Sequence, residues 1–328
     1  MGEPLQIVVA LSHDDEPYVK IQDKLAASDV PDSEYVLVRS EGPRHLEALM
    51  PETDVLIAWG LAPELLAKAK HLKWLHLGLV GVGELMYPEL LDSDIRLTNS
   101  MGFHHVPVAE HVFALILTYT RAIHISMRNQ FERRWNRRVA AYAVYELNGK
   151  TLGIVGLGKI GKSVAKLGRA FGMRVIGYDI SEIKDENVDR VYAENQLPKL
   201  LEQSDFVVLS VPFTSKTERI IGIDEIRAMK QTAFLVNVGR GRLIDEPILI
   251  EALSKGWIAG AGLDVFETEP LPSDSPFFSL GNVIMTPHIA GATPDYWDHV
   301  GKIFADNLKG FLAGNPMVTE LDKTVYKE

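Results

Sequence analysis

The chain has 328 residues, of which 46% are hydrophobic and 24% charged, and it carries a formal net charge of −10. This length suits two domains, and the acidic balance argues against a nucleic acid partner because phosphate backbones would repel the chain. The chain has no cysteine, which excludes disulfides, a thiolate nucleophile and cysteine-ligated zinc, and no apolar run reaches the roughly 18 residues that a membrane span needs. We therefore expect a cytoplasmic protein without a membrane partner.

The first hundred residues alternate between short strand-like runs and helical segments. Strands are predicted at 6–12, 34–40, 54–59, 73–79 and 95–100, with helical segments around 17–26 and 63–70. The strand-like runs are almost continuously apolar, which is typical of parallel strands that are covered by helices on both faces. The pattern predicts an α/β domain.

A different pattern occupies residues 102–126, where an apolar sequence with few helix breakers predicts one long helix. A helix that is apolar on all sides is expected to be buried, between domains or at a subunit interface. The basic residues that follow are predicted to form a solvated helix face; they are Arg133, Arg134, Arg137 and Arg138.

The alternation restarts at residue 151. Strands are predicted at 151–156, 173–179, 190–193, 206–211, 233–239, 259–266 and 283–288, and an amphipathic helix around 294–313 ends the pattern. The predicted fold class is therefore α/β, with two doubly wound parallel-sheet domains of the Rossmann or flavodoxin type and an interdomain cleft.

A glycine motif follows the first strand of the second half. Gly156, Gly158 and Gly161 form G-x-G-x-x-G between that strand and a helical run. The first glycine permits a tight turn, the second allows the backbone to approach a pyrophosphate, and the third lets the helix pack on the strand. The free N–H groups at the helix N-terminus would then face the phosphates of a dinucleotide.

The same residues also match G-x-x-x-x-G-K-[ST], the P-loop pattern of nucleoside triphosphate sites, through Lys162 and Ser163. Asp179 favours the dinucleotide, because it ends the next predicted strand where a carboxylate accepts hydrogen bonds from the adenosine ribose. A carboxylate there repels a 2′-phosphate and no arginine follows directly, so NAD is predicted rather than NADP. Residues 101–290 are the predicted NAD-binding domain, and residues 1–100 with 291–328 the predicted substrate-binding domain.

Three polar residues follow strand ends of the second domain and are the candidates for chemistry. They are Arg240, Glu269 and His288. Histidine titrates near neutrality and suits a general acid or base, while a neighbouring carboxylate would fix its tautomer and stabilise the imidazolium. An arginine would clamp a substrate carboxylate and polarise the reacting carbonyl. This set suits hydride transfer at C2 of a 2-hydroxy acid.

Four motifs in this order resemble the D-isomer-specific 2-hydroxyacid dehydrogenase family. They are GLGKIG (156–161), NVGRG (237–241), AGLDVFETEP (261–270) and TPHIAGAT (286–293). The resemblance implies an NAD-dependent reaction on a small 2-oxo or 2-hydroxy acid, a D-configured product and a homodimer. It implies that Arg240, Glu269 and His288 are catalytic. It also implies further cofactor contacts, at Lys159, Ile160, Val211, Val238, Gly239, Asp264, Ala290 and Gly291.

The resemblance also implies that a loop of the first domain, at Val80 and Gly81, holds the substrate carboxylate. Family members often carry Gly-Val-Asp in this loop, whereas here Gly81 and Val82 are followed by Gly83. We expect backbone N–H groups, and not the missing aspartate, to bind the carboxylate.

Two alternatives remain open from the sequence. A non-enzymatic NAD-sensing scaffold of the same superfamily would carry the same motifs, and a P-loop protein would bind ATP and not NADH. Without cysteine and without H-E-x-x-H, no metal site is predicted at His104, His105 and His111, which are expected to pack or to line the cleft.

Overall fold

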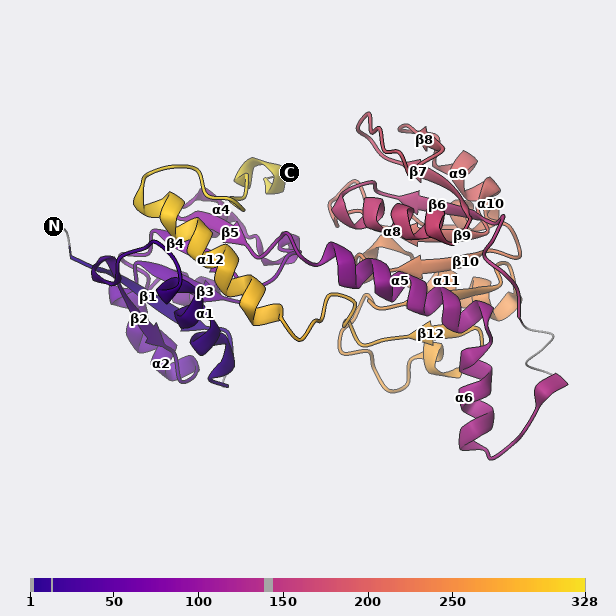
Figure 1. Ribbon diagram of the computed structural model, residues 1–328, viewed down its shortest axis with the longest axis horizontal. Helices are drawn as coiled ribbons and strands as arrows, with labels where there is room; N and C mark the ends of the chain where they lie inside the picture. Colours follow the sequence, from indigo (N-terminus) through magenta and orange to yellow (C-terminus); the bar gives the residue numbers. More distant parts are fainter. Residues whose placement is uncertain (1–2, 13, 139–143, 328) are drawn as a thin grey trace. The chain divides into compact units, whose positions relative to one another are not determined.

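The computed structural model describes residues 3–12, 14–138 and 144–327. These residues form two compact units. Unit 1 contains Met1–Phe103 and Thr293–Glu328, and unit 2 contains His104–Ala292. Both units are α/β, and every strand pair in both sheets is parallel, which confirms the prediction of two parallel-sheet α/β domains (Figure 1).

Unit 1 is built on a five-stranded sheet with strand order β2-β1-β3-β4-β5, which is the flavodoxin-like doubly wound order. Its strands are β1 Leu5–Ala10, β2 Tyr35–Arg39, β3 Val55–Ala58, β4 Trp74–Leu77 and β5 Arg96–Asn99. Its helices are α1 Glu16–Ala26, α2 Pro43–Leu49, α3 Pro63–Leu66, α4 Pro88–Asp92 and α12 Tyr296–Leu312. The five strands and the final helix lie where the sequence predicts them, whereas the helix predicted at 63–70 is a single turn.

Alternate residues of each strand in unit 1 enter two separate cores. Ile7 and Val9 pack with α1 and α12 on one face of the sheet, where Phe304 stacks on Trp74 at a centroid distance of 4.8 Å. Val8 and its neighbours pack with α4 and the loops on the other face. Strand residues therefore read as continuous apolar runs because both faces are buried.

Unit 2 is built on a seven-stranded sheet of order β12-β11-β10-β9-β6-β7-β8. Its strands are β6 Thr151–Val155, β7 Arg174–Tyr178, β8 Arg190–Tyr192, β9 Phe206–Leu209, β10 Phe234–Asn237, β11 Gly260–Leu263 and β12 Val283–Met285. The described helices are α5 His105–Thr120, α6 Ile123–Phe131, α8 Lys159–Ala170, α9 Leu197–Gln203, α10 Ile223–Ala228 and α11 Glu246–Lys255. In chain order this is the Rossmann arrangement, whose strand order reverses between β6 and β9.

The prediction of one helix over 102–126 is wrong. α5 ends at Thr120, Ala122 has a left-handed φ of 52°, and α6 starts again at a bend of 68°. α5 is buried against the sheet, as its composition indicates, but α6 has no buried residue (Figure 1). No glycine or proline marks the break, so the sequence gives no local signal for it. Within the described residues, no single helix is long and apolar enough to cross a membrane, although the bent pair meets the length and composition requirement.

The basic residues after α6 are exposed, as predicted, but Arg133 and Arg134 do not lie on a helix face. α6 ends at Phe131, and Arg133 adopts a left-handed φ of 54° in the turn that follows. Arg134 pairs with Glu132 at the surface.

Candidate active site

The glycine turn lies at the carboxyl end of β6, where the strand order of unit 2 reverses. Gly156 has φ +95°, and a Cβ there would lie 2.9 Å from the backbone nitrogen of Val211. A Cβ on Gly161 would lie 2.0 Å from the Gly156 carbonyl oxygen, whereas one on Gly158 would meet nothing within 4 Å. The first and third glycines are thus required by close packing, and the second leaves open space beside the turn, as a bound pyrophosphate requires.

The position at which α8 starts distinguishes the dinucleotide interpretation of the glycine motif from the P-loop interpretation. The helix begins at Lys159, with Gly158 as its N-cap, so Ile160 and Gly161 are already helical. A P-loop would need these residues in a loop around the phosphates, ahead of the lysine and serine. The geometry therefore suits a dinucleotide, whose pyrophosphate would face the first N–H groups of α8.

Asp179 follows the end of β7 and is half-buried. Its Oδ2 accepts a hydrogen bond from the Leu157 N–H at 2.8 Å, and its Oδ1 accepts one from the Ser181 N–H at 2.9 Å. These bonds fix the carboxylate beside the glycine turn. Each oxygen retains a lone pair for a ribose hydroxyl.

The predicted acid–base pair is in direct contact. His288 Nδ1 lies 2.7 Å from Glu269 Oε2, and the other oxygen of Glu269 accepts a hydrogen bond from the Phe266 N–H at 2.9 Å. An ionised carboxylate only accepts hydrogen bonds, so Nδ1 carries a hydrogen. Nε2 is therefore the ring nitrogen that remains available for proton transfer. The side chain of His288 is 47% exposed, which leaves it accessible to a substrate.

Asp264 holds the segment that carries His288. Its carboxylate is 1% exposed and accepts hydrogen bonds from the hydroxyl of Thr286 at 2.6 Å and from the backbone N–H groups of Ile289 and Ala290 at 2.9 and 2.8 Å. Its backbone oxygen accepts from the His288 N–H at 2.8 Å. His288 itself has a left-handed φ of 55°, which this set of bonds maintains.

Arg240 is brought next to the Glu269 segment by its neighbour Gly241. A Cβ on Gly241 would lie 1.9 Å from the carbonyl carbon of Phe266, so only glycine permits this approach. Arg240 is half-buried, and one guanidinium nitrogen donates to the Gly239 carbonyl oxygen at 2.8 Å. The remaining guanidinium donors are suited to a carboxylate or carbonyl oxygen.

The other predicted cofactor contacts lie at strand ends of unit 2. Lys159 is exposed at the first position of α8, while Ile160 packs against the core. Val211 and the pair Val238–Gly239 follow β9 and β10, and Gly291 lies so close to His104 that a Cβ would be 2.9 Å from its ring. Ala290 is buried. Their predicted contacts with a cofactor stay predictions.

The loop after β4 in unit 1 has its carbonyl groups tied inward. The Gly78 oxygen accepts from the Tyr296 hydroxyl at 2.6 Å, the Leu79 oxygen from the Ser100 N–H at 3.0 Å, and the Val80 oxygen from the Asn99 side-chain amide at 2.8 Å. Since the C=O and N–H of a trans peptide point in opposite directions, the N–H groups of the next residues point away from these partners. Within the described part of the chain, no acceptor bonds to the N–H of Val80 or Gly81. Such a row of N–H groups suits an anion.

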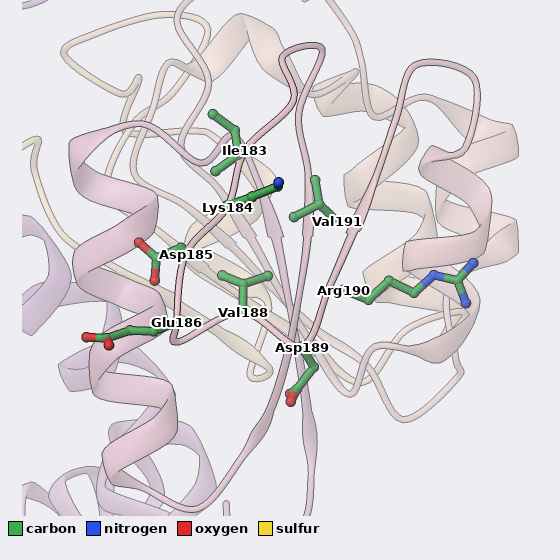
Figure 2. Close-up of a pocket in the computed structure, with 8 residues that line it drawn as sticks. All are labelled: Ile183, Lys184, Asp185, Glu186, Val188, Asp189, Arg190 and Val191. Atoms are coloured by element: carbon green, nitrogen blue, oxygen red, sulfur yellow. The ribbon is translucent and has the colours of Figure 1, made fainter.

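A surface hollow of about 450 Å³ lies in the segment between β7 and β8 (Figure 2). Asp185 and Glu186 lie on one side of it and Arg190 on the other. Asp189, which also lines it, already accepts hydrogen bonds from Arg169 at 2.7 Å and from the Val175 N–H at 2.9 Å. None of the candidate catalytic side chains lines this hollow.

The sequence pointed to Glu269 and His288, which lie in contact, but not to the residues that orient them or the loop at Val80 and Gly81. Thr286 bonds to Asp264 and also lies 2.8 Å from His111 Nε2, so that histidine packs within unit 2. Asn99 and Tyr296 act on a loop that neither residue adjoins in sequence. The only available signal for Asn99 was a polar side chain at the end of a predicted strand.

Comparisons with known proteins show the family to which the chain belongs. A family model described as "D-isomer specific 2-hydroxyacid dehydrogenase, NAD binding domain" matches residues 113–290. The glyoxylate reductase of Korarchaeum cryptofilum (strain OPF8) is 39% identical over 254 residues, which are 76% of this chain and 75% of that protein. The glyoxylate reductase of Pyrococcus furiosus is 38% identical over 255 residues, which are 76% of this chain and 75% of that protein.

Solved structures are similar over nearly the whole chain. A D-isomer specific 2-hydroxyacid dehydrogenase family protein from Aeromonas salmonicida has a TM-score of 0.85 and 33% identity, and the match covers 98% of this chain and 100% of that one. An NADPH-dependent glyoxylate/hydroxypyruvate reductase from Sinorhizobium meliloti, in complex with NADP and sulfate, has a TM-score of 0.82 and 26% identity, with 98% and 99% coverage.

Proposed function

The chain belongs to the D-isomer specific 2-hydroxyacid dehydrogenase family, and we propose that it uses NADH to reduce a small 2-oxo acid to the D-2-hydroxy acid, with His288 as the proton donor. Like its family, it is an oxidoreductase that transfers a hydride between a nicotinamide dinucleotide and a 2-oxo or 2-hydroxy acid. The observation that carries the assignment of roles is the 2.7 Å contact between His288 Nδ1 and Glu269 at the carboxyl edge that also bears the glycine turn.

The cofactor would be held by the glycine turn, the start of α8 and Asp179, and when bound its nicotinamide supplies the hydride. His288 in its protonated form donates a proton from Nε2 to the C2 oxygen, because Nδ1 is engaged by Glu269. Glu269 holds the imidazole in this orientation and stabilises its charged form. In the oxidising direction neutral His288 accepts the hydroxyl proton at the same atom.

Arg240 polarises the C2 carbonyl and pairs with the substrate carboxylate through the guanidinium donors that Gly239 leaves available. The N–H groups of Val80 and Gly81 bind the far side of the carboxylate, since their carbonyl neighbours are tied inward. In this proposal residues 1–100 and 291–328 serve the substrate, and residues 101–290 serve the cofactor. A nicotinamide-dependent reductase of this kind is proposed to work in the cytoplasm.

The assignment is tested by following NADH oxidation at 340 nm across a panel of 2-oxo acids. Glu269→Gln should lower kcat by about 100-fold or more, because the amide no longer stabilises imidazolium, while NADH binding is retained. Glu267→Gln is the matched control, two residues away and 37% exposed, and should match the unmodified protein. Tight NADH binding with no turnover of any 2-oxo acid would instead support an NAD-sensing scaffold.

The preference for NAD over NADP is proposed from Asp179. Its carboxylate is fixed beside the turn, and it is followed by Ile180, whose exposed side chain offers no positive charge to a 2′-phosphate. Asp179→Ala should shift the ratio of kcat/KM for NADH over NADPH by about 10-fold or more towards NADPH, as loss of a like charge predicts. Asp185→Ala, in the same segment between β7 and β8, serves as the control. An unchanged ratio in Asp179→Ala would contradict the ribose assignment.

We further propose that the chain forms a homodimer through the exposed side of α6. Ile123, Met127 and Phe131 are spaced four residues apart on α6 and are 42%, 50% and 82% exposed. Trp135, which lies beyond the end of α6, is 95% exposed. A single apolar stripe can pair with its own copy across a twofold axis. Phe131→Asp should convert a dimer to a monomer in sedimentation velocity, and Phe278→Asp, at another exposed phenylalanine, should not. A monomer in the unmodified protein would refute the proposal.

A further inference from the structure

The side chain of Trp59 is large, apolar and partly exposed at the carboxyl edge of the sheet in unit 1. It directly follows β3, at the carboxyl end of the parallel sheet, where ligands of open α/β sheets bind. It is 41% exposed, whereas Trp74 in the adjacent strand is completely buried. Tryptophan supplies a large apolar contact area and is enriched at binding interfaces, so the exposed part of Trp59 is a candidate contact surface for a ligand.

The indole of Trp59 is fixed in place. Its Nε1–H donates to the Leu11 carbonyl oxygen, which anchors the ring to the end of β1. The ring packs against Trp297 at a centroid distance of 5.6 Å and against Tyr296 at 6.5 Å, both from the start of α12. The exposed part is therefore a rigid apolar surface and not a mobile side chain.

This surface adjoins the proposed carboxylate loop. A Cβ on Gly78, the residue after β4, would lie 3.6 Å from Trp59 Cζ3 and 2.6 Å from Leu11 Cδ2. The Gly78 carbonyl oxygen is the one held by the Tyr296 hydroxyl. The same aromatic cluster that supports Trp59 thus also fixes the start of the loop that carries Val80 and Gly81.

We propose that Trp59 determines substrate specificity by packing against the C3 substituent of the 2-oxo acid, and that the preferred substituent is apolar and planar, as in an aryl-substituted pyruvate. The inference rests on the proposed function, because it places the substrate carboxylate at Val80 and Gly81. A rigid indole provides apolar contact area with little loss of side-chain entropy on binding. The side chains around it, the buried Leu11 and the partly buried Tyr296 and Trp297, are apolar or aromatic and offer no cation for a charged substituent.

The test compares phenylpyruvate with glyoxylate, which has no C3 and therefore serves as an internal control. The unmodified protein should have a higher kcat/KM for phenylpyruvate than for glyoxylate. Trp59→Ala should lower kcat/KM for phenylpyruvate by about 30-fold, within the range for lost apolar contacts in a pocket, and change it by at most about 2-fold for glyoxylate. Trp59→Phe keeps an aromatic ring and should retain most of the phenylpyruvate activity.

Trp257→Ala is the matched control, since Trp257 lies in unit 2 and stacks under Arg227 at 3.3 Å. It should leave both substrates unaffected. An equal loss for both substrates in Trp59→Ala would show that the indole only supports the loop, and this would overturn the inference, as would unchanged phenylpyruvate kinetics. Efficient reduction of glyoxylate without reduction of phenylpyruvate would overturn this inference alone, whereas no reduction of any 2-oxo acid would overturn the proposed function itself.

Discussion

The two units are built alike but present different chemistry at the same edge of their sheets. Unit 2 presents side chains: the half-exposed His288 bonded to Glu269, with Arg240 nearby on the chain that packs against the Glu269 segment. Unit 1 presents backbone: the N–H groups of Val80 and Gly81, which face outward because their carbonyl neighbours are tied inward. We therefore propose that one parallel-sheet design serves proton transfer in one unit and anion binding in the other.

The histidines of the two units show the same contrast. His288 lies beyond β12 and is 47% exposed. His76 lies within β4, is fully buried, and bonds to Thr98 at 2.7 Å and Ser100 at 3.1 Å. Burial lowers the pKa of His76 to about 3, so it is neutral at physiological pH and contributes to packing and not to proton transfer. A histidine at a sheet edge is therefore suited to catalysis only where the fold leaves it accessible.

The largest expected effect comes from removing the side-chain chemistry of unit 2. His288→Ala should lower kcat by about 1,000-fold, in the middle of the range for loss of a general acid–base group. The dissociation constant for NADH, followed by fluorescence titration, should stay within about 2-fold, because the glycine turn and Asp179 are untouched. His124→Ala, a half-buried histidine of unit 2 that bonds to the Thr118 carbonyl oxygen at 3.0 Å, is the control. Full activity in His288→Ala would remove the proposed proton donor.

A smaller effect is expected on the stability of unit 1 as a function of pH. Unfolded histidine has a pKa near 6.5, so between pH 6.5 and 3 the unfolded chain binds a proton that folded His76 does not. The stabilisation is complete above pH 6.5 and is lost as the pH falls through this window. Lowering the pH from 7 to 5 should cost about 2 kcal/mol through His76.

Urea unfolding of the full chain at both pH values measures this loss. His76→Gln lacks the titrating group, so its free energy of unfolding should fall by about 2 kcal/mol less than that of the unmodified protein over the same pH interval. The test compares how much the free energy of unfolding changes between the two pH values, and not its absolute value. It therefore stays valid if His76→Gln itself weakens packing. An equal change in the free energy of unfolding of the two proteins between pH 7 and pH 5 would contradict the assigned role of His76.

Much of the fold could be predicted from the sequence because its signals are local. Continuous apolar runs marked the strands of both sheets, and G-x-G-x-x-G after a strand marked the turn at Gly156. The bend after Thr120 could not be predicted, because neither glycine nor proline lies there and the left-handed residue is a buried alanine, Ala122. The sequence likewise gave no sign that α6 would be exposed while α5 is buried.

The candidate site shows the same limit. Glu269 and His288 could be singled out because a carboxylate and an imidazole are recognisable acid–base groups in the sequence itself. The structure brings the two side chains into contact. The orientation of the Val80–Gly81 peptide depends on Asn99, which lies 19 residues away. The start of the same loop, at the Gly78 carbonyl oxygen, is held by Tyr296 from 218 residues away. A backbone site is set by such distant partners, so its position can be suggested by resemblance but its geometry requires the fold.

The smallest expected effect concerns Asn99, which we propose acts on the substrate only through the backbone of unit 1. Its side-chain amide donates to the Val80 carbonyl oxygen at 2.8 Å, and its Oδ1 accepts from the Met101 N–H at 3.3 Å. Asn99→Ala frees the Val80–Gly81 peptide to rotate, which should raise KM for the 2-oxo acid by about 10-fold, as expected for a weakened hydrogen-bonded carboxylate. The KM for NADH should not change, because the cofactor is proposed to bind unit 2. Asn99→Asp keeps the acceptor for Met101 but loses the donor and adds a like charge, so its KM should rise further. A fall in kcat without a change in either KM would show that Asn99 does not orient the carboxylate loop.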